Sequence, residues 1–281
     1  MERFTLTSGP VSVVVSPDTG GRIAQITYGD TELLIGNDHV HVTNNLLGWG
    51  CYPMVPFAGR LHNAEFEWDN KTWSTHKNLD PHAIHGTTMA RAWDVMRVDN
   101  ESVQLRIALD DGSGTLWPFG GSCMQTISVG EHTDGRSAVT CVLSVDGAIP
   151  GSPLQLGWHP WFVKPTQCEF SFAHMYIRDT EGITTSSRVM PTPPPWDNCF
   201  AGVRVNPRLC VDDINIELRS NLSHWVIFDE LPYATCAEPQ SGPPNEFNFS
   251  SDEKAALDLQ GFRHDGDTHT AEFTMLFNRP T

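Results

Sequence analysis

Ile214-Asn215-Ile216-Glu217-Leu218-Arg219 alternates apolar and polar side chains without a break. Successive side chains of a strand point to opposite faces, so this period of two predicts a strand with one buried face. No segment of the chain keeps the 3.6-residue period of an amphipathic helix over several turns. The sequence therefore predicts an all-β fold with few short helices.

The remaining strand candidates are short and are separated by residues that favour turns, chiefly glycine, proline, asparagine and aspartate. Residues 65–68 and 72–74 flank Asp69-Asn70-Lys71, which suits a tight hairpin. Only residues 252–259 have a helical pattern. The other predicted strands cover residues 11–15, 22–28, 32–35, 103–109, 124–129, 139–145, 225–228 and 271–277.

The length and composition suit one large domain. The chain has 281 residues, of which 39% are hydrophobic, with 23 Gly and 20 Pro. All-β domains often reach 200–250 residues, and the frequent turn formers favour many short strands. No internal repeat or linker divides the chain, so we expect a single antiparallel β domain over residues 1–281.

The charge balance narrows the classes of partner. The chain has 18 basic and 34 acidic side chains, a formal net charge of −16. A surface this negative repels phosphate backbones and anionic lipid, which argues against nucleic-acid binding and against a membrane role. A neutral small molecule is the partner that fits best.

The cysteines and the first residues indicate a reducing compartment. Seven cysteines are scattered without a C-x-x-C pair, so they suit buried small side chains better than a disulfide framework. The start, Met1-Glu2-Arg3-Phe4-Thr5, lacks the basic and apolar regions of a secretory signal. We therefore expect a soluble cytoplasmic protein.

Two proline-locked segments carry a histidine and a carboxylate: Gly157-Trp158-His159-Pro160-Trp161-Phe162 and Ala237-Glu238-Pro239-Gln240. Proline disfavours helical backbone for the residue before it, so His159 and Glu238 should both be extended. A histidine and a carboxylate form a natural acid and base for moving protons. This interpretation requires the fold to bring them together across 79 residues of sequence.

Both segments also have plain structural interpretations. The three rings around His159 suit a core aromatic cluster as well as they suit a wall for a sugar ring. Glu238 precedes a turn-rich stretch, so we expect it to end a strand at a sheet rim, where sites are often built. Glu246 lies nearby and is expected to be solvated.

Further polar residues follow stiff segments. Arg60 ends Tyr52-Pro53-Met54-Val55-Pro56-Phe57-Ala58-Gly59-Arg60, where its guanidinium could donate two hydrogen bonds to adjacent hydroxyls of a ligand or lie on the surface. Asp197 follows Thr192-Pro193-Pro194-Pro195-Trp196 on a predicted loop, where it could bind a ligand or cap the turn.

Two other segments contain side chains that can bind metals. In Asp80-Pro81-His82-Ala83-Ile84-His85-Gly86, the proline and glycine favour a loop or strand over a helix. Strand geometry would point His82 and His85 to opposite faces, which favours one structural and one functional histidine over a metal pair. His264-Asp265-Gly266-Asp267 is more simply a turn before the last strand.

Together these segments resemble the aldose 1-epimerase (galactose mutarotase-like) family along nearly the whole chain. Five motifs stand in the order and spacing of that family, and no single one would suffice. They are the run ending in Ala58-Gly59-Arg60, His85-Gly86, His159-Pro160-Trp161-Phe162, Asp197 with Phe200, and Glu238-Pro239-Gln240.

The resemblance implies a β-supersandwich with large antiparallel sheets, a sugar-binding cleft on one face, and neither cofactor nor metal. By motif match, Glu238 is the catalytic base and His159 the catalytic acid, with His85 assisting at the reacting oxygens. The substrate-binding residues would be Arg60, Asp197, Trp158 and Phe200. The chain departs from the family pattern at Gly59, Thr87 and Asn198, where asparagine, glycine and histidine are usual.

The implied reaction exchanges the α and β anomers of a free aldohexose, which makes the protein an isomerase. A base removes the proton of the C1 hydroxyl, an acid protonates the ring oxygen, and closure reverses both transfers. Ordinary pKa values near 4.3 for Glu and 6.5 for His make a Glu⁻/HisH⁺ pair accessible near neutral pH, and the carboxylate should favour the charged imidazole.

Three alternatives stay open. The chain could act on a phosphorylated or otherwise modified sugar, although no cluster of basic residues accompanies the motifs in the sequence. It could bind or sense a sugar without catalysis, although both the acid and the base are present. It could also be a metalloenzyme with His82, His85 and His159 as ligands.

Overall fold

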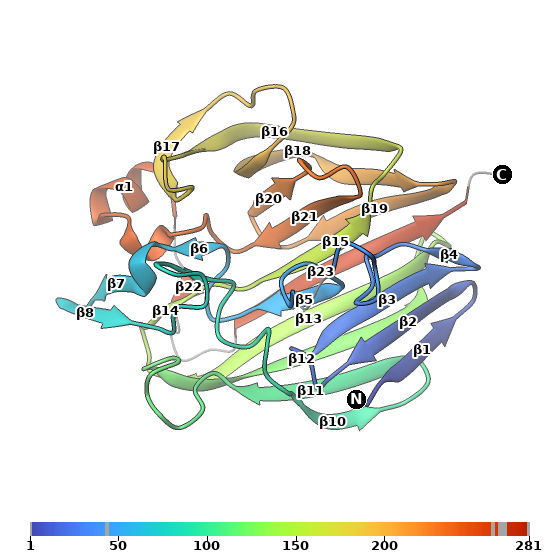
Figure 1. Ribbon diagram of the computed structural model, residues 1–281, viewed down its shortest axis with the longest axis horizontal. Coiled ribbons are helices and arrows are strands. Elements are labelled where there is room, and N and C mark those ends of the chain that lie inside the picture. The colour runs from blue at the N-terminus through green and yellow to red at the C-terminus, as the bar shows by residue number, and fades with distance from the viewer. Residues whose placement is uncertain (1, 43–44, 260–261, 264–268, 280–281) are drawn as a thin grey trace.

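The protein folds almost entirely into antiparallel strands. The computed structural model describes residues 2–42, 45–259, 262–263 and 269–279 (Figure 1). These residues form 23 strands, one α-helix and two 3-10 helices. The prediction of an all-β fold with few short helices is therefore confirmed. The turn predicted at residues 264–267 lies outside the described residues.

The elements follow one another in an order dominated by strands. The first part of the chain contains β1 Phe4–Ser8, β2 Val11–Ser16, β3 Arg22–Tyr28, β4 Thr31–Glu32, β5 Cys51–Met54, β6 Arg60–Leu61, η1 His62–Ala64, β7 Glu65–Trp68, β8 Lys71–Ser74, β9 Ala83–Ile84, β10 Asp94–Val98 and β11 Ser102–Ala108. The second contains β12 Gly120–Glu131, β13 Ser137–Ala148, β14 Pro153–Leu154, β15 Gly157–Val163, β16 Gln167–Arg178, β17 Thr184–Val189, β18 Asp197–Val211, β19 Ile214–Ser220, β20 His224–Phe228, β21 Ala234–Gln240, η2 Glu246–Asn248, α1 Ser251–Ala256, β22 Phe262–Arg263 and β23 His269–Asn278.

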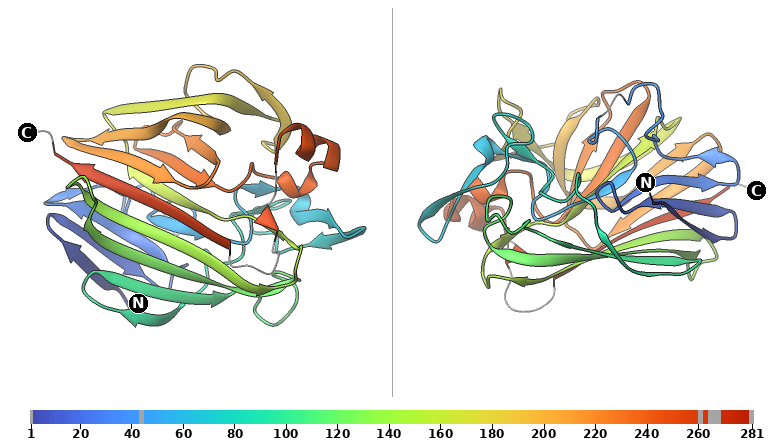
Figure 2. Two further views of the ribbon diagram at one scale, coloured as in Figure 1. Left: turned by 180° about the vertical axis from the view of Figure 1, so that it is seen from behind. Right: turned by 60° about the horizontal axis from the view of Figure 1, so that its bottom comes forward.

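Hydrogen bonding connects most of the strands into two layers of one continuous sheet. In the first layer the neighbours run β10, β11, β12, β13, β23 and β19. In the second layer they run β20, β21, β15, β5, β3, β2 and β1. The right-hand view of Figure 2 shows the green strands as a layer beneath the orange and blue ones.

The long strand β18 joins the two layers. Its last residues pair with β19 in the first layer, and its first residues pair with β20 in the second. A 15-residue strand exceeds the usual five or six residues, which lets one segment take part in both layers. The expected two-layer supersandwich is therefore present.

The core lies between the layers. Trp158 of β15 is fully buried and its ring lies 5.9 Å from that of Phe273 on β23, which belongs to the other layer. Trp225 of β20 contacts the same phenylalanine. Burying such rings removes large apolar areas from water, at about 25 cal/mol for each Å². The opposite face of the second layer is thus left free to form a site.

Several local predictions can be compared directly with the structure. The hairpin is confirmed as β7 and β8, joined by Asp69 and Asn70, which both have positive φ. The strand predicted at residues 32–35 is wrong, because only Glu32 lies in a strand and Leu34 forms an isolated bridge to Phe162. Side chains at residues 33–35 are buried without belonging to a ladder.

The helix predicted near residue 252 is confirmed as α1. Ser250 caps it, since its hydroxyl accepts from the Glu253 amide while the Glu253 carboxylate accepts from the Ser250 amide. None of the helices in the described part of the chain has the length and apolar character needed to span a bilayer.

Candidate active site

The site is built on one cross-strand row of the second layer. β15 lies between β5 and β21, and its antiparallel register pairs Gly157 with Gln240 and Trp161 with Cys236. His159 stands midway between these two pairs and therefore faces Glu238 across the ladder. Directly opposed side chains of neighbouring strands have Cβ atoms about 5 Å apart, so this register brings the two side chains within reach.

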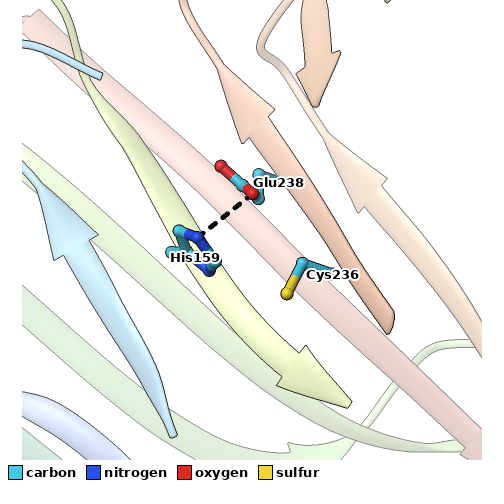
Figure 3. A group of neighbouring side chains, drawn as sticks. All are labelled: His159, Cys236 and Glu238. Carbon is cyan, nitrogen blue, oxygen red and sulfur yellow. Dashed lines mark ion pairs between the residues drawn. The ribbon is translucent and has the colours of Figure 1, made fainter. Parts of the chain in front are cut away.

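The contact between the two side chains is direct. His159 Nε2 lies 3.2 Å from Glu238 Oε1, and both residues are almost completely buried. Figure 3 shows the imidazole and the carboxyl group pointing toward each other from adjacent strands. Gln240 Nε2 donates to the second carboxyl oxygen of Glu238 at 3.1 Å. The fold thus brings His159 and Glu238 together, as the acid–base interpretation of the sequence requires.

The prolines contribute to this geometry. Pro160 and Pro239 have no amide hydrogen, so neither can donate to the ladder at the positions beside His159 and Glu238. His159 and Glu238 both lie in strands, as expected for residues that precede a proline. Glu238 lies within β21 and is 2% exposed, so the expectation of a carboxylate at a sheet rim is wrong. Glu246, expected in solvent, is also buried and accepts from Gln155 Nε2 at 2.9 Å.

Aromatic rings hold the imidazole of His159 on both sides. The Tyr52 ring stacks on it at 4.9 Å and the Trp161 ring at 5.2 Å, measured between centroids. The ring of His85 meets it edge-on at 4.8 Å. His85 has a positive φ of 56°, and its amide donates to the Gly59 carbonyl at 3.0 Å. The rings fix the imidazole plane and exclude water from it.

Burial determines the protonation of the pair. It lowers the pKa of His159 to about 3, with the positive charge of Arg22 acting in the same direction. It also raises the pKa of Glu238 well above its usual value, and the negative charge of Asp197 adds to this effect. Burial therefore favours a neutral imidazole beside a protonated carboxyl group. Desolvation therefore opposes the Glu⁻/HisH⁺ state that ordinary pKa values make accessible near neutral pH, an effect that the sequence did not reveal.

We expect stability to fall as the pH drops from 6.5 to 4. Burial lowers the pKa of His85 well below 6.5 and that of His224 to about 4, as it does for His159. The unfolded chain binds protons on these histidines below pH 6.5 that the folded chain excludes, whereas the raised pKa of Glu238 opposes this by one proton. His224 alone should lower the free energy of unfolding by about 3 kcal/mol over this pH range.

Urea unfolding between pH 4 and 7 measures this dependence, with His224→Gln as the control. The slope of the unfolding free energy against pH reports how many more protons the unfolded protein binds than the folded one. In the variant this difference should be smaller by about one proton. A slope identical to that of the unaltered protein would contradict the assignment of a neutral buried His224.

A cavity of about 230 Å³ opens above the pair. His159, Glu238, His85 and Trp161 form one part of its wall. The remaining lining comes from Asn45, Leu47, Gly59, Arg60, Ile84, Arg178, Gly182, Thr184, Asp197, Asn198, Cys199, Val226, Phe228 and Pro244. Concave sites of this kind, apolar with a few convergent polar groups, are typical of small-molecule binding.

Arg60 and Asp197 both line the cavity, where they form an ion pair that a third residue, Arg178, joins. Arg60 Nη1 lies 3.6 Å from Asp197 Oδ2, and Arg178 Nη1 forms a closer ion pair with the same oxygen. Both arginines also donate to the Gly182 carbonyl, at 3.3 and 3.2 Å. Asp197 is the first residue of β18 and not part of a loop, so that prediction is wrong.

Two predicted binding residues lie elsewhere. Trp158 is fully buried on the opposite face of β15, and its indole nitrogen donates to Gln125 Oε1 at 3.2 Å. Phe200 is 1% exposed and packs on Phe172. Neither residue lines the cavity. Successive residues of a strand face opposite sides, so Trp158 could not share the face of His159.

Of the three histidines proposed as metal ligands, His82 lies apart from His85 and His159, whose rings are in contact. His82 Nδ1 accepts from the Asn63 amide at 3.1 Å and its ring faces His62, away from the cavity. Within the described residues, one group of three metal-capable side chains is close together: His159, Cys236 and Glu238, with ligand atoms within 4.8 Å of one another.

The three departures from the family pattern have different surroundings. Gly59 has φ of +67°, and a Cβ there would lie 2.5 Å from the Pro244 ring, so an asparagine could not fit without displacing that ring. Asn198 lines the cavity and donates to the Tyr176 carbonyl. Thr87 donates to the Leu109 carbonyl and does not line the cavity.

Sequence reasoning missed Arg178 and Trp161 as lining residues. Trp161 could have been found, because it lies two residues after His159 on a predicted extended segment and shares its face. Arg178 offers no such signal, since its segment contains no motif and its position depends on the pairing of β16 with β18.

Comparison with known proteins places the chain in a family. The aldose 1-epimerase family model matches residues 2–229. YphB, an uncharacterised protein of Escherichia coli K12, is 28% identical over 165 residues, which are 58% of this chain and 52% of that protein. The match thus spans about half the length of this relative.

Two solved structures share the fold over nearly the whole chain. A GalM/aldose epimerase homologue from C. elegans has a TM-score of 0.82 at 16% identity, covering 100% of this chain and 99% of that one. A galactose mutarotase-like protein from Clostridium acetobutylicum has a TM-score of 0.81 at 15% identity, covering 99% and 95%. With the family match covering most of the residues, the chain belongs to the aldose 1-epimerase family.

Proposed function

We propose that the protein is an aldose 1-epimerase that interconverts the α and β anomers of a free aldohexose. The observation that carries this proposal is the buried contact of 3.2 Å between His159 Nε2 and Glu238 Oε1 on the wall of the cavity. A base and an acid held side by side can act on two neighbouring oxygens of one pyranose. The family membership supports the same reaction type.

The reaction needs two proton transfers and one bond cleavage. Glu238, as a carboxylate, takes the proton of the C1 hydroxyl, while His159, as an imidazolium, gives a proton to the ring oxygen. The bond between C1 and the ring oxygen breaks and the C1 carbonyl forms. Rotation about the C1–C2 bond and reversal of both transfers then produce the other anomer.

The resting pair reaches this reactive state by an internal proton shift. One proton moves from the Glu238 carboxyl group to His159 Nε2 across their contact, which leaves the total charge of the pair unchanged. Sugar hydroxyls that donate to the carboxylate stabilise the ionised form in a cavity from which water is excluded. His85, whose ring lies edge-on to that of His159, is proposed to hold the reacting oxygens.

Arg60 and Asp197 are proposed to bind the hydroxyls remote from C1. Both lie half-buried on the cavity wall, where a guanidinium donates and a carboxylate accepts. Arg178 already donates to Asp197, so this residue presents fewer free acceptor positions than the sequence implied. The geometry therefore favours a substrate that accepts hydrogen bonds at this end of the cavity.

A screen of free aldoses tests the proposal. Polarimetry should show faster mutarotation of at least one aldohexose in the presence of the protein, and NMR saturation transfer should connect its two anomeric protons. A non-catalytic sugar-binding protein would instead give binding without faster exchange. Absence of acceleration for every aldose that binds would overturn the proposed activity.

A second candidate substrate is a sugar that carries a phosphate or carboxylate group. Its support is the second guanidinium, Arg178, which the fold places beside Arg60 although the sequence showed no basic cluster. Asp197 neutralises one of these two charges. Adding a hexose 6-phosphate and a hexuronate to the screen decides between the two substrate classes. If a charged sugar is the substrate, its kcat/KM should exceed that of the neutral sugar.

A further inference from the structure

A fully buried arginine lies behind the acid–base pair. Arg22, the first residue of β3, has no exposed surface. The pairing of Ile23 with Cys51 places Arg22 opposite Tyr52, and Tyr52 pairs with His159 in turn. Arg22 therefore belongs to the same cross-strand row as the two proposed catalytic residues.

The guanidinium is held by backbone carbonyl groups. Nε donates to Thr19 at 2.8 Å, Nη1 to Leu46 at 2.9 Å and to Trp49 at 3.0 Å, and Nη2 to Met89 at 2.9 Å. Among the residues that the structure describes, no carboxylate forms an ion pair with it. A buried charge is costly unless it is hydrogen-bonded, so these four contacts fix both the side chain and the segments that accept from it.

These segments form two walls of the cavity. Residues 46–49 belong to the loop whose Asn45 and Leu47 line the cavity. Met89 lies four residues after His85, which lines the cavity and has a left-handed backbone. One side chain thus links the loop that supplies two lining residues to the segment that carries His85.

Stacked rings continue the row from Arg22 to the imidazole. The guanidinium carbon lies 4.2 Å from the centroid of the Trp49 ring and 4.9 Å from that of Tyr52. The Tyr52 ring in turn stacks on that of His159 at 4.9 Å and meets that of His85 edge-on at 5.9 Å. A single tyrosine ring therefore separates a permanent positive charge from the proposed catalytic acid.

We propose that Arg22 is a positioning residue for the acid–base pair: it ties together the two segments that line the cavity, and its fixed charge adds to the effect of burial in keeping the His159 imidazole neutral until substrate is bound. The inference rests on the proposed function for its catalytic meaning, but its electrostatic part concerns the resting protein alone. Coulomb's law at an effective dielectric constant of about 20 gives about one pKa unit for unit charges about 10 Å apart.

The other groups around His159 do not replace this effect. Its neighbours on the packed elements are Glu238 and Cys236 on β21, Tyr52 on β5 and His85 after β9. The carboxyl group would favour a charged imidazole, whereas a charged His85 would disfavour it. Arg22, in contrast to these titratable neighbours, keeps its charge over the working pH range.

The test is an NMR titration of the His159 imidazole in the ¹⁵N-labelled full-length protein, assigned with His159→Asn. In Arg22→Met we expect the pKa of His159 to rise by about one unit or more and kcat/KM to fall at least tenfold. In Arg22→Lys, which keeps a charge but has fewer donors, the pKa should stay low while kcat/KM still falls.

The outcomes separate this inference from the proposed activity. A folded Arg22→Met with an unmoved His159 pKa would overturn it, whether or not the protein exchanges anomers. If Arg22→Met does not fold, Arg22→Lys decides the question, and a displaced pKa or unaltered kinetics in that variant would overturn the inference. A residue with a merely structural role would lower activity equally in both variants and leave the His159 pKa unmoved.

Discussion

Replacing Glu238 by glutamine is expected to lower kcat for anomer exchange by 10²–10⁴-fold or more, the usual contribution of a positioned acid or base. The amide has the shape of the carboxyl group and can still accept from Gln240 Nε2, so the fold should persist. It cannot take the proton of the C1 hydroxyl. Polarimetry on the purified variant, with circular dichroism for folding, measures both expectations.

Glu32→Gln is a suitable control for this variant. Glu32 is an exposed glutamate on β4 and does not line the cavity, so the same chemical change should leave kcat unaltered. Full activity in Glu238→Gln would place the base elsewhere. Equal losses in both variants would point to a defect unrelated to the cavity.

Replacing Gly86 by alanine is expected to destabilise the protein by about 3 kcal/mol or more and to disturb the placement of His85. Gly86 has φ of +77°, and a Cβ there would lie 2.0 Å from the Val55 carbonyl oxygen. That oxygen accepts from the Thr87 amide at 2.9 Å, so the segment cannot shift without losing the bond. Chemical denaturation and kcat/KM measure the two effects.

Gly135→Ala separates backbone strain from steric overlap. Gly135 has a similar φ of +83°, but a Cβ there would meet nothing within 4 Å. It should cost only the strain of a left-handed alanine, about 1 kcal/mol, without changing activity. Comparable destabilisation in the two variants would show that the close approach of Gly86 to Val55 is unimportant.

The chemistry of the site could be predicted from the sequence, whereas its protonation could not. Proline after His159 and after Glu238 indicated extended backbone, and both residues lie in strands. Their direct opposition depends on the register of β15 and β21, which is a long-range property. The extent of burial follows from the whole fold, and desolvation disfavours the charged form of both residues.

Period-two reasoning explains other successes and failures. The alternation at residues 214–219 predicted β19, and the same rule assigns Trp158 to the face opposite His159, against the role that the family resemblance implied. β18 was missed because Gly202, Asn206 and Pro207 interrupt its pattern with residues that favour turns. Tertiary pairing with three neighbouring strands compensates for their low strand propensity.

The most direct measurement is a double-mutant cycle on anomer exchange with His159→Asn, Glu238→Gln and the combined variant. Residues that pass one proton between them act as a unit, so each single change should remove nearly all catalysis and the combination should cost little more. NMR saturation transfer between the anomers of the preferred aldose gives the three rates. Losses that multiply in the combined variant would contradict a shared proton between residues 159 and 238.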